Sequence, residues 1–206
     1  MFVPKNLRIQ EKEHIAQFIS EHSFGVVVSD TLDATHIPFT FKQEEGEQGV
    51  LYGHIARANP HIQQLTGENA LVIFSGPHAY ISPTWYENGP SVPTWNYAAV
   101  HCTGRASLLN DDETIQAMDD LVAKYEPALL NNKTLMPEEY QDKLRRGVVG
   151  FKVVIEHIDA KEKLGQQRKV PDQQGVFKAL QESAELGDIQ LANYMHKRQL
   201  GVGDIQ

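Results

Sequence analysis

The stretch "NALVIFSGPHAYISPTWYENGPSVPTWNYAAVHCTGRASL", residues 69–108, contains the densest strand-type sequence of the chain. Its second half, residues 94–108, predicts the longest strand. Its first half predicts two shorter strands, 69–76 and 79–85, separated by a turn at Gly76-Pro77. Between the halves, the segment "YENGPSVP" is rich in Asn, Gly and Pro, so the chain turns there. A connection this short favours antiparallel pairing of the strands that flank it.

Further strands and helices are expected on both sides of this stretch. Apolar runs bounded by turn residues predict four more strands, at residues 24–30, 35–41, 49–55 and 148–164. Helical spacing of apolar residues predicts helices at 11–22, 110–126 and 137–146, and two short helices broken near Gly187 in the last thirty residues. Many short strands with few long helices between them favour an antiparallel barrel or sandwich over a parallel sheet. We therefore expect an α+β fold built on one barrel-like domain.

The composition limits the kinds of protein that this chain can be. Its 206 residues suffice for one sizeable domain and are too few for two ordinary ones, so residues 1–206 are expected to form a single domain. No stretch approaches the roughly 20 apolar residues that cross a bilayer, and the N-terminus lacks the apolar region of a secretion signal. With one cysteine, Cys102, and no histidine pair at metal-ligand spacing, neither a disulfide nor a metal site is expected. The expected location is a reducing cytoplasm.

Both tryptophans of the chain, Trp85 and Trp95, follow a Pro-Thr pair on either side of the predicted turn. A tryptophan at the rim of a sheet offers a large flat apolar face and one N–H donor. Such a pair suits a planar aromatic ligand or a partner subunit. The alternative is that both rings close the end of the core, as most buried aromatic residues do. The spacing alone favours this second reading.

A second candidate site lies in "YGHIARANPHIQQL", residues 52–65. Asn59 followed by Pro60 is a strong helix start, with a capping side chain and a proline at the first helical position. His54 and Arg57 lie just ahead of it. Free backbone N–H groups, the positive end of the helix dipole and the arginine would converge on one point, which suits an anionic group such as a phosphate. The alternative is an ordinary strand-to-helix junction with a solvated arginine.

Five segments of the chain resemble a known family. In order along the sequence they are "HIPF", "LYGHIARANPH", "AYISPTWY", "VPTWNYAAVHCTGRA" and "KEKLGQQR". Together they resemble the PaiB family, bacterial negative transcriptional regulators in the FMN-binding split-barrel superfamily, and the similarity runs nearly from end to end. One departure lies in the last segment, where Gly165 and Gln167 replace the Ser and Asn that are usual in the family. The role of residues 161–169 is therefore open.

The resemblance implies an antiparallel split β-barrel with peripheral helices and a C-terminal arm at residues 161–206. It also implies a homodimer that binds FMN at the subunit interface. The phosphate would meet the end of a barrel strand, the flavin ring would lie along the backbone of a neighbouring strand, and aromatic residues would line or close the groove. The residues implied for these three roles are, in order, His54, Ile55, Arg57 and Asn59; Pro38 and Phe39; and Trp85, Trp95 and Tyr97.

The family implies negative regulation of sporulation and of degradative-enzyme (protease) synthesis, yet the chain offers little for direct DNA binding. No helix-turn-helix with exposed basic residues is visible, and 27 acidic residues outnumber 19 basic ones. The two basic clusters, residues 143–146 and 161–169, are small and have acidic neighbours. Regulation is therefore expected to be indirect, through flavin redox state, a small ligand or a protein partner.

Two alternative functions stay open at this point. One is a flavin-dependent oxidoreductase similar to the pyridoxamine-phosphate oxidases, and the other is a haem-binding split barrel with a histidine as axial ligand. The sequence nominates no acid–base residue, so both enzymatic activity and catalytic residues are left undetermined.

Overall fold

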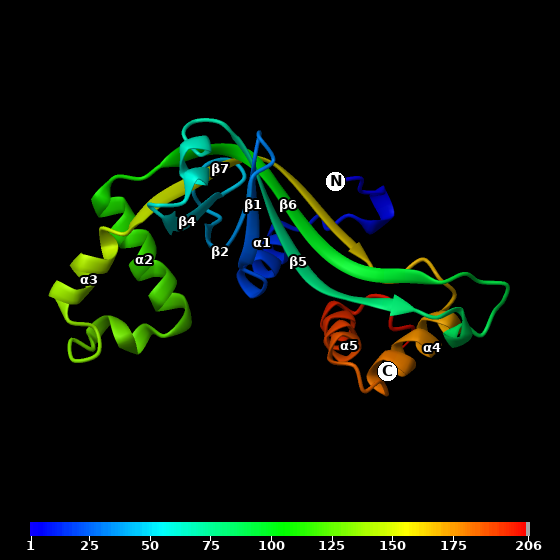
Figure 1. The fold of residues 1–206 in the computed structure, drawn as a ribbon. Helices are drawn as coiled ribbons and strands as arrows, with labels where there is room; N and C mark the ends of the chain where they lie inside the picture. Colours follow the sequence, from blue (N-terminus) through cyan, green and yellow to red (C-terminus); the bar gives the residue numbers. More distant parts are fainter. Residues whose placement is uncertain (205–206) are drawn as a thin grey trace. The chain divides into compact units, whose positions relative to one another are not determined.

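One antiparallel sheet of seven strands organises the protein in the computed structural model, which describes residues 1–204 (Figure 1). The strands follow the order β2-β1-β5-β6-β7-β4-β3 across the sheet. Their bounds are β1 Phe24–Ser29, β2 Ala34–Pro38, β3 Thr40–Lys42, β4 Val50–Ala56, β5 Asn69–Ile81, β6 Thr94–Leu108 and β7 Val148–Lys163. The predicted strand at 94–108 is thus confirmed at both ends, and the antiparallel α+β fold class is confirmed.

Helices fill the connections between the strands. The α-helices are α1 Lys12–Glu21, α2 Asp111–Tyr125, α3 Glu138–Arg145, α4 Val170–Gln181 and α5 Leu186–Arg198. Short 3-10 helices are η1 Lys5–Leu7, η2 Pro60–Gln64, η3 Pro83–Trp85 and η4 Pro127–Asn131. Asn110 caps α2, because its side chain accepts from the Glu113 backbone N–H while the Glu113 carboxylate accepts from the Asn110 backbone N–H.

The chain divides into two units. Unit 1 comprises Met1–Glu11, Ser75–Ala99 and the chain from Asp159, and unit 2 comprises Lys12–Phe74 and Val100–Ile158. Strands β5, β6 and β7 contribute residues to both units. The description of residues 1–206 as one domain, with 161–206 as its arm, stays a prediction.

Three phenylalanine rings form the centre of the unit 2 core. Phe39, Phe74 and Phe151 are fully buried, and Phe39 meets the other two rings edge to face, at centroid distances of 5.6 and 6.1 Å. Close approach of β6 to β7 requires a glycine, because a Cβ at Gly104 would lie 2.0 Å from the carbonyl oxygen of Val154. This packing holds the strands that carry the second candidate site.

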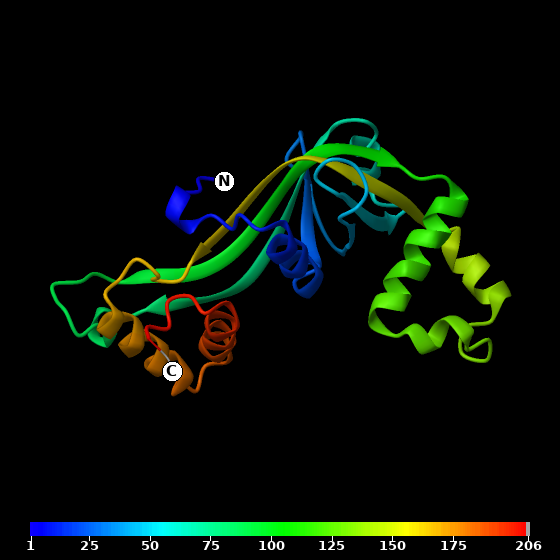
Figure 2. The ribbon, with the colours of Figure 1, turned by 180° about the vertical axis from the view of Figure 1, so that it is seen from behind.

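In unit 1 the pair of helices α4 and α5 packs beside the ends of β5 and β6, while the N-terminal segment runs along β7 (Figures 1 and 2). The backbone N–H of Ile9 donates to Ala160 of β7 at 3.1 Å. Helix α5 is fastened to β7 by Glu162, which accepts from the Tyr194 hydroxyl and from the Arg198 guanidinium. Helix α5 is thereby anchored to the sheet by a buried charge.

The prediction of a turn at Gly76-Pro77 is wrong, because β5 continues through both residues as far as Ile81. Proline lacks the N–H that a central strand must donate, so it is tolerated where one edge of the strand is free. Strand β1 pairs with β5 only over residues 70–73, and Pro77 lies beyond that pairing. Two smaller differences are a break at Phe39 between β2 and β3 and a helix break at residues 182–185 instead of Gly187.

Candidate functional site

The junction after β4 has the predicted helix start. Asn59 caps the segment that begins at Pro60, and its side-chain oxygen accepts from the His61 N–H at 3.0 Å. The segment is η2, a 3-10 helix of five residues, and not an α-helix. So few aligned peptide units make only a weak dipole, so side chains would supply most of the binding energy for an anion here. That the start of η2 contributes to anion binding stays a prediction.

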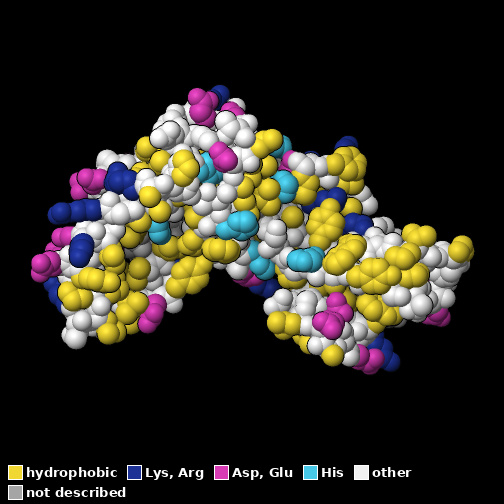
Figure 3. Space-filling model, in the orientation of Figure 1, with side chains coloured by type: hydrophobic (Ala, Val, Ile, Leu, Met, Phe, Trp, Pro, Cys, Tyr) yellow, Lys and Arg dark blue, Asp and Glu magenta, His cyan; other side chains and the backbone are white. Residues whose placement is uncertain are grey.

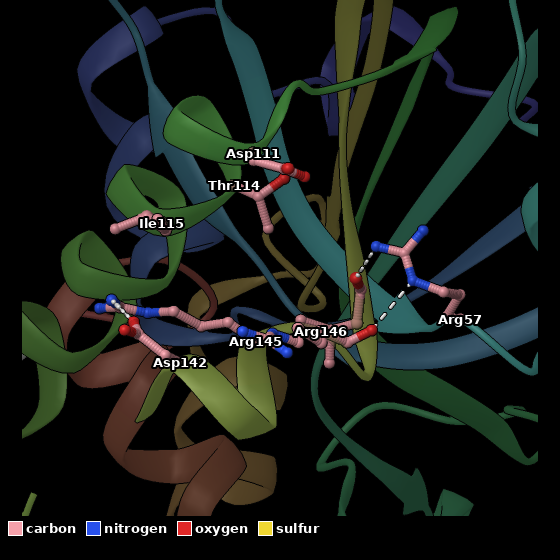
Figure 4. A pocket seen from close by; sticks show the side chains of 8 residues that line it. Arg57, Asp111, Thr114, Ile115, Asp142, Arg145 and Arg146 are labelled. Carbon is pink, nitrogen blue, oxygen red and sulfur yellow. Dashed lines mark hydrogen bonds and ion pairs between the residues drawn. The ribbon is translucent and has the colours of Figure 1, made fainter. Parts of the chain in front are cut away.

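Arg57 is held in a fixed position at this junction. Its backbone N–H donates to Gly147 at 2.9 Å, its Nε donates to the carbonyl of Arg146 at 3.0 Å, and its Nη2 donates to the carbonyl of Val148 at 3.0 Å (Figure 4). A guanidinium has five N–H donors, so three remain after these two side-chain bonds. Arg57 is therefore preorganised, with donors left for a ligand.

Arg57 lines a cavity of about 430 Å³ in unit 2. The cavity lies between the N-terminal turn of α2, the C-terminal end of α3 and the start of β7 (Figure 4). Its lining residues are Arg57, Asp111, Thr114, Ile115, Asp142, Arg145, Arg146 and Val148. Of these, the sequence-based site contained Arg57 alone. The basic cluster at 143–146 was the one sequence signal for the others, and nothing in the sequence linked it to Arg57.

The other predicted residues of unit 2 have side chains that are less available. Burial lowers the pKa of His54, so its ring is neutral at neutral pH and offers a phosphate no positive charge. The side chain of Ile55 is 3% exposed and that of Phe39 is fully buried in the core. The backbone N–H of Phe39 donates to Ser23 at 2.9 Å. Pro38, at the end of β2, and the backbone around it are what this strand can offer a flavin ring.

In unit 1 the two tryptophans occupy different settings. Trp95 is 53% exposed, and its ring lies 6.2 Å from His78 and 6.3 Å from Tyr80, centroid to centroid. Trp85 is half-buried in η3, where its carbonyl packs so closely on α4 that only glycine fits at position 175. Trp95 thus suits a ligand or partner, whereas Trp85 helps to seal the unit.

Cations border the exposed rings of unit 1. The Lys161 ammonium lies 5.2 Å from the centre of the Tyr97 ring, and the Lys163 ammonium donates to the carbonyl of Trp95 at 2.7 Å. Figure 3 shows hydrophobic side chains gathered over this part of β5 and β6, with lysine and arginine side chains beside them. This aromatic face consists of His78, Tyr80, Trp95 and Tyr97.

The structure thus divides the predicted site residues between its two units. Those from Pro38 to Asn59 belong to unit 2, whereas Trp85, Trp95 and Tyr97 belong to unit 1. That they serve one binding site stays a prediction. Within residues 1–204 no cluster of three or more His, Cys, Asp or Glu side chains could hold a metal ion.

Residues 1–157 match the model of the family described as "Putative FMN-binding domain". This chain belongs to that family. The membership confirms the family predicted from the sequence, and FMN is the cofactor for which the family is described. Along 96% of this chain and 98% of the other, the sequence is 37% identical to the "Protease synthase and sporulation protein PAI 2" of Bacillus subtilis (strain 168).

Solved structures share the fold of this family member at low sequence identity. The flavocytochrome Anf3 from Azotobacter vinelandii is 15% identical, with a TM-score of 0.57 over 79% of this chain and 73% of that chain. The FAD and haem binding protein from Mycobacterium smegmatis is 14% identical, with a TM-score of 0.57 over 77% of this chain and 74% of that one. These similarities confirm the split-barrel fold. None of the helices in residues 1–204 has the length and apolar character needed to cross a membrane.

Proposed function

We propose that this protein is an FMN-binding homodimer that acts as a negative transcriptional regulator without being a strong DNA-binding protein itself. The observation that carries the proposal is the end-to-end similarity, at 37% identity, to a Bacillus subtilis protein named for protease synthesis and sporulation. The regulated processes would be sporulation and the synthesis of degradative enzymes. The cytoplasm is the corresponding location.

The residues present fit FMN. A fixed arginine, Arg57, presents free N–H donors at a cavity, as a phosphate requires, and Trp95 presents an exposed planar ring. When bound, FMN supplies a redox centre that accepts and returns electrons. The protein's own side chains would bind the phosphate at Arg57 and restrict water at the ring through Trp95 and Tyr97.

A homodimer would cover apolar side chains that one chain leaves exposed. In unit 1 these include Tyr80 at 45% and Trp95 at 53%; in unit 2 they include Leu135, Tyr140 and Leu144, each more than half exposed. Exposed large apolar side chains that lie together in one patch are typical of surfaces that contact a partner. In such a dimer the flavin would lie at the interface between the two subunits.

Indirect regulation is favoured by the charge of the chain. Its formal net charge is −8, so the long-range field repels the phosphate backbone of DNA. Of the basic cluster at 143–146, Arg145 already contacts two carboxylates, those of Asp119 and Asp142. We expect no operator binding near physiological salt in the ~10⁻⁸–10⁻¹¹ M range of specific DNA-binding proteins.

Flavin titration tests the proposal. The purified protein should bind FMN more tightly than FAD, and Arg57→Ala should weaken FMN binding by roughly ten- to a hundredfold, because a hydrogen bond to a charged group is worth about 1.5–3 kcal/mol. Sedimentation equilibrium at micromolar concentration should show a dimer. A Soret band in place of flavin absorbance, or unchanged FMN affinity in the variant, would contradict the assignment. Anisotropy titration with promoter DNA, with competitor present, tests the indirect mode.

A further inference from the structure

The cavity beside Arg57 contains more positive charge than its acidic residues neutralise. Three arginines line it, Arg57, Arg145 and Arg146, against two aspartates. In the described part of the chain, neither the Arg57 nor the Arg146 guanidinium forms an ion pair. Two positively charged side chains at one cavity repel each other, and an anion bound between them would offset this repulsion.

Arg145 is not part of this excess charge. Figure 4 shows its side chain extending away from Arg57 towards Asp142. Its Nη1 lies 3.4 Å from Asp142 and its Nη2 lies 3.3 Å from Asp119, and Nη2 also donates to Gln141 at 3.2 Å. Its charge is therefore compensated within the protein. The uncompensated charges are those of Arg57 and Arg146.

The backbone couples these two arginines. Because Arg57 donates to the carbonyls of Arg146 and Val148, it fixes the turn from which the Arg146 side chain departs. Arg146 is the C-cap residue of α3, so its position depends on the end of that helix as well. A side chain 89 positions away in sequence is thus brought to the cavity that Arg57 lines.

We propose that this cavity binds a phosphate monoester, with Arg57 and Arg146 together holding the phosphate. Planar guanidinium groups match the geometry of phosphate oxygens and give charge-assisted hydrogen bonds. Asp111, at the α2 side of the cavity, has no ion pair within residues 1–204. Its carboxylate accepts a hydrogen bond from a hydroxyl group of the same ligand. A cavity of about 430 Å³ exceeds the needs of phosphate alone and admits a hydroxylated carbon chain or sugar.

The inference rests on the proposed function in one respect, because the phosphate monoester in this cavity can be the ribityl phosphate of a bound FMN. The other candidate ligand is a free sugar phosphate. The role of Arg146 is new in either case, and it assigns a ligand-binding task to the helical segment between β6 and β7.

The experiment measures binding of four probes: FMN, riboflavin, ribose 5-phosphate and inorganic phosphate. The variants are Arg146→Ala and, as a matched control, Lys143→Ala, which removes an equal charge from an exposed position of α3 outside the cavity lining. Flavin fluorescence reports the flavins, and calorimetry reports the other two probes. Circular dichroism verifies that each variant keeps its fold, as expected for exposed side chains.

Arg146→Ala should weaken FMN binding by roughly ten- to a hundredfold and leave riboflavin binding within about twofold of the unsubstituted protein. Lys143→Ala should change neither by more than about twofold. If Arg146→Ala binds FMN as tightly as the unsubstituted protein does, the inference is overturned while the proposed FMN binding stands. If the unsubstituted protein binds ribose 5-phosphate but not FMN, and Arg146→Ala loses that binding, the site stands and the proposed function fails. If it binds neither phosphate ester, both fail.

Discussion

The ion pair that joins α5 to β7 can be tested by removing a single charge. Glu162 is 3% exposed and accepts from Arg198 Nε at 2.6 Å, from Arg198 Nη2 at 3.1 Å and from the Tyr194 hydroxyl at 2.5 Å. Glu162→Gln keeps the size of the side chain and removes its charge. The Arg198 guanidinium, whose side chain is 15% exposed, then loses the counter-charge that contacts it.

The expected loss of stability is large. Removing one partner of a buried ion pair costs about 3–5 kcal/mol. Native proteins are stable by about 5–15 kcal/mol in total, so this is a substantial share. For a chain of this length, each 1 kcal/mol shifts Tm by roughly 2–4 °C. Glu162→Gln should therefore lower Tm by about 6–20 °C.

The assay is thermal unfolding followed by tryptophan fluorescence, with urea unfolding as a second measure of stability. Both tryptophans belong to unit 1, which also contains Glu162, so the signal reports on the unit that is perturbed. The control is Glu182→Gln on α4, where the Lys178–Glu182 pair is 3.9 Å long and its side chains are 74% and 68% exposed. Such a surface pair contributes less than about 0.5 kcal/mol. If the two variants unfold at the same urea concentration, the buried pair does not anchor α5 and the reasoning is refuted.

Two further predictions concern unit 2. Burial raises the pKa of Cys102 to about 12, so the native protein should not react with a thiol reagent at pH 8 and should react rapidly in urea; fast native labelling would contradict the buried position. Burial also lowers the pKa of His61, whose Nδ1 lies 2.7 Å from Thr35 Oγ1 and whose buried Nε2 lacks a hydrogen-bond partner within residues 1–204. His61 is then protonated at a higher pH in the unfolded chain than in the folded protein. The free energy of unfolding should therefore be unaffected by this group above about pH 6.5 and decrease as the pH falls below it. His61→Gln should flatten the decrease between pH 7.5 and 5.5, and an unchanged slope would exclude His61 as its source.

Local sequence determined most of the secondary structure. Strand β6 at residues 94–108 and the cap of α2 at Asn110 were predictable because strand periodicity and capping depend on residues close together in the chain. Family membership followed in the same way from short segments in a fixed order. Arg57 was identified because a strand end and a helix start enclose it.

The tertiary structure decided what those elements become and what surrounds them. Pro77 stays inside β5 because β1 pairs with that strand only as far as residue 73. The local sequence around Pro77 does not show where the neighbouring strand ends. Phe39 belongs to the core because Phe74 and Phe151 meet it there. The proposed phosphate site would join Arg57 to Arg146 across 89 positions, since only the hydrogen-bonded register of β4 with β7 brings the two segments together. The periodicity of the sequence indicates on which face of a strand or helix a side chain lies. The packing of the whole sheet decides which distant residues lie on the same face.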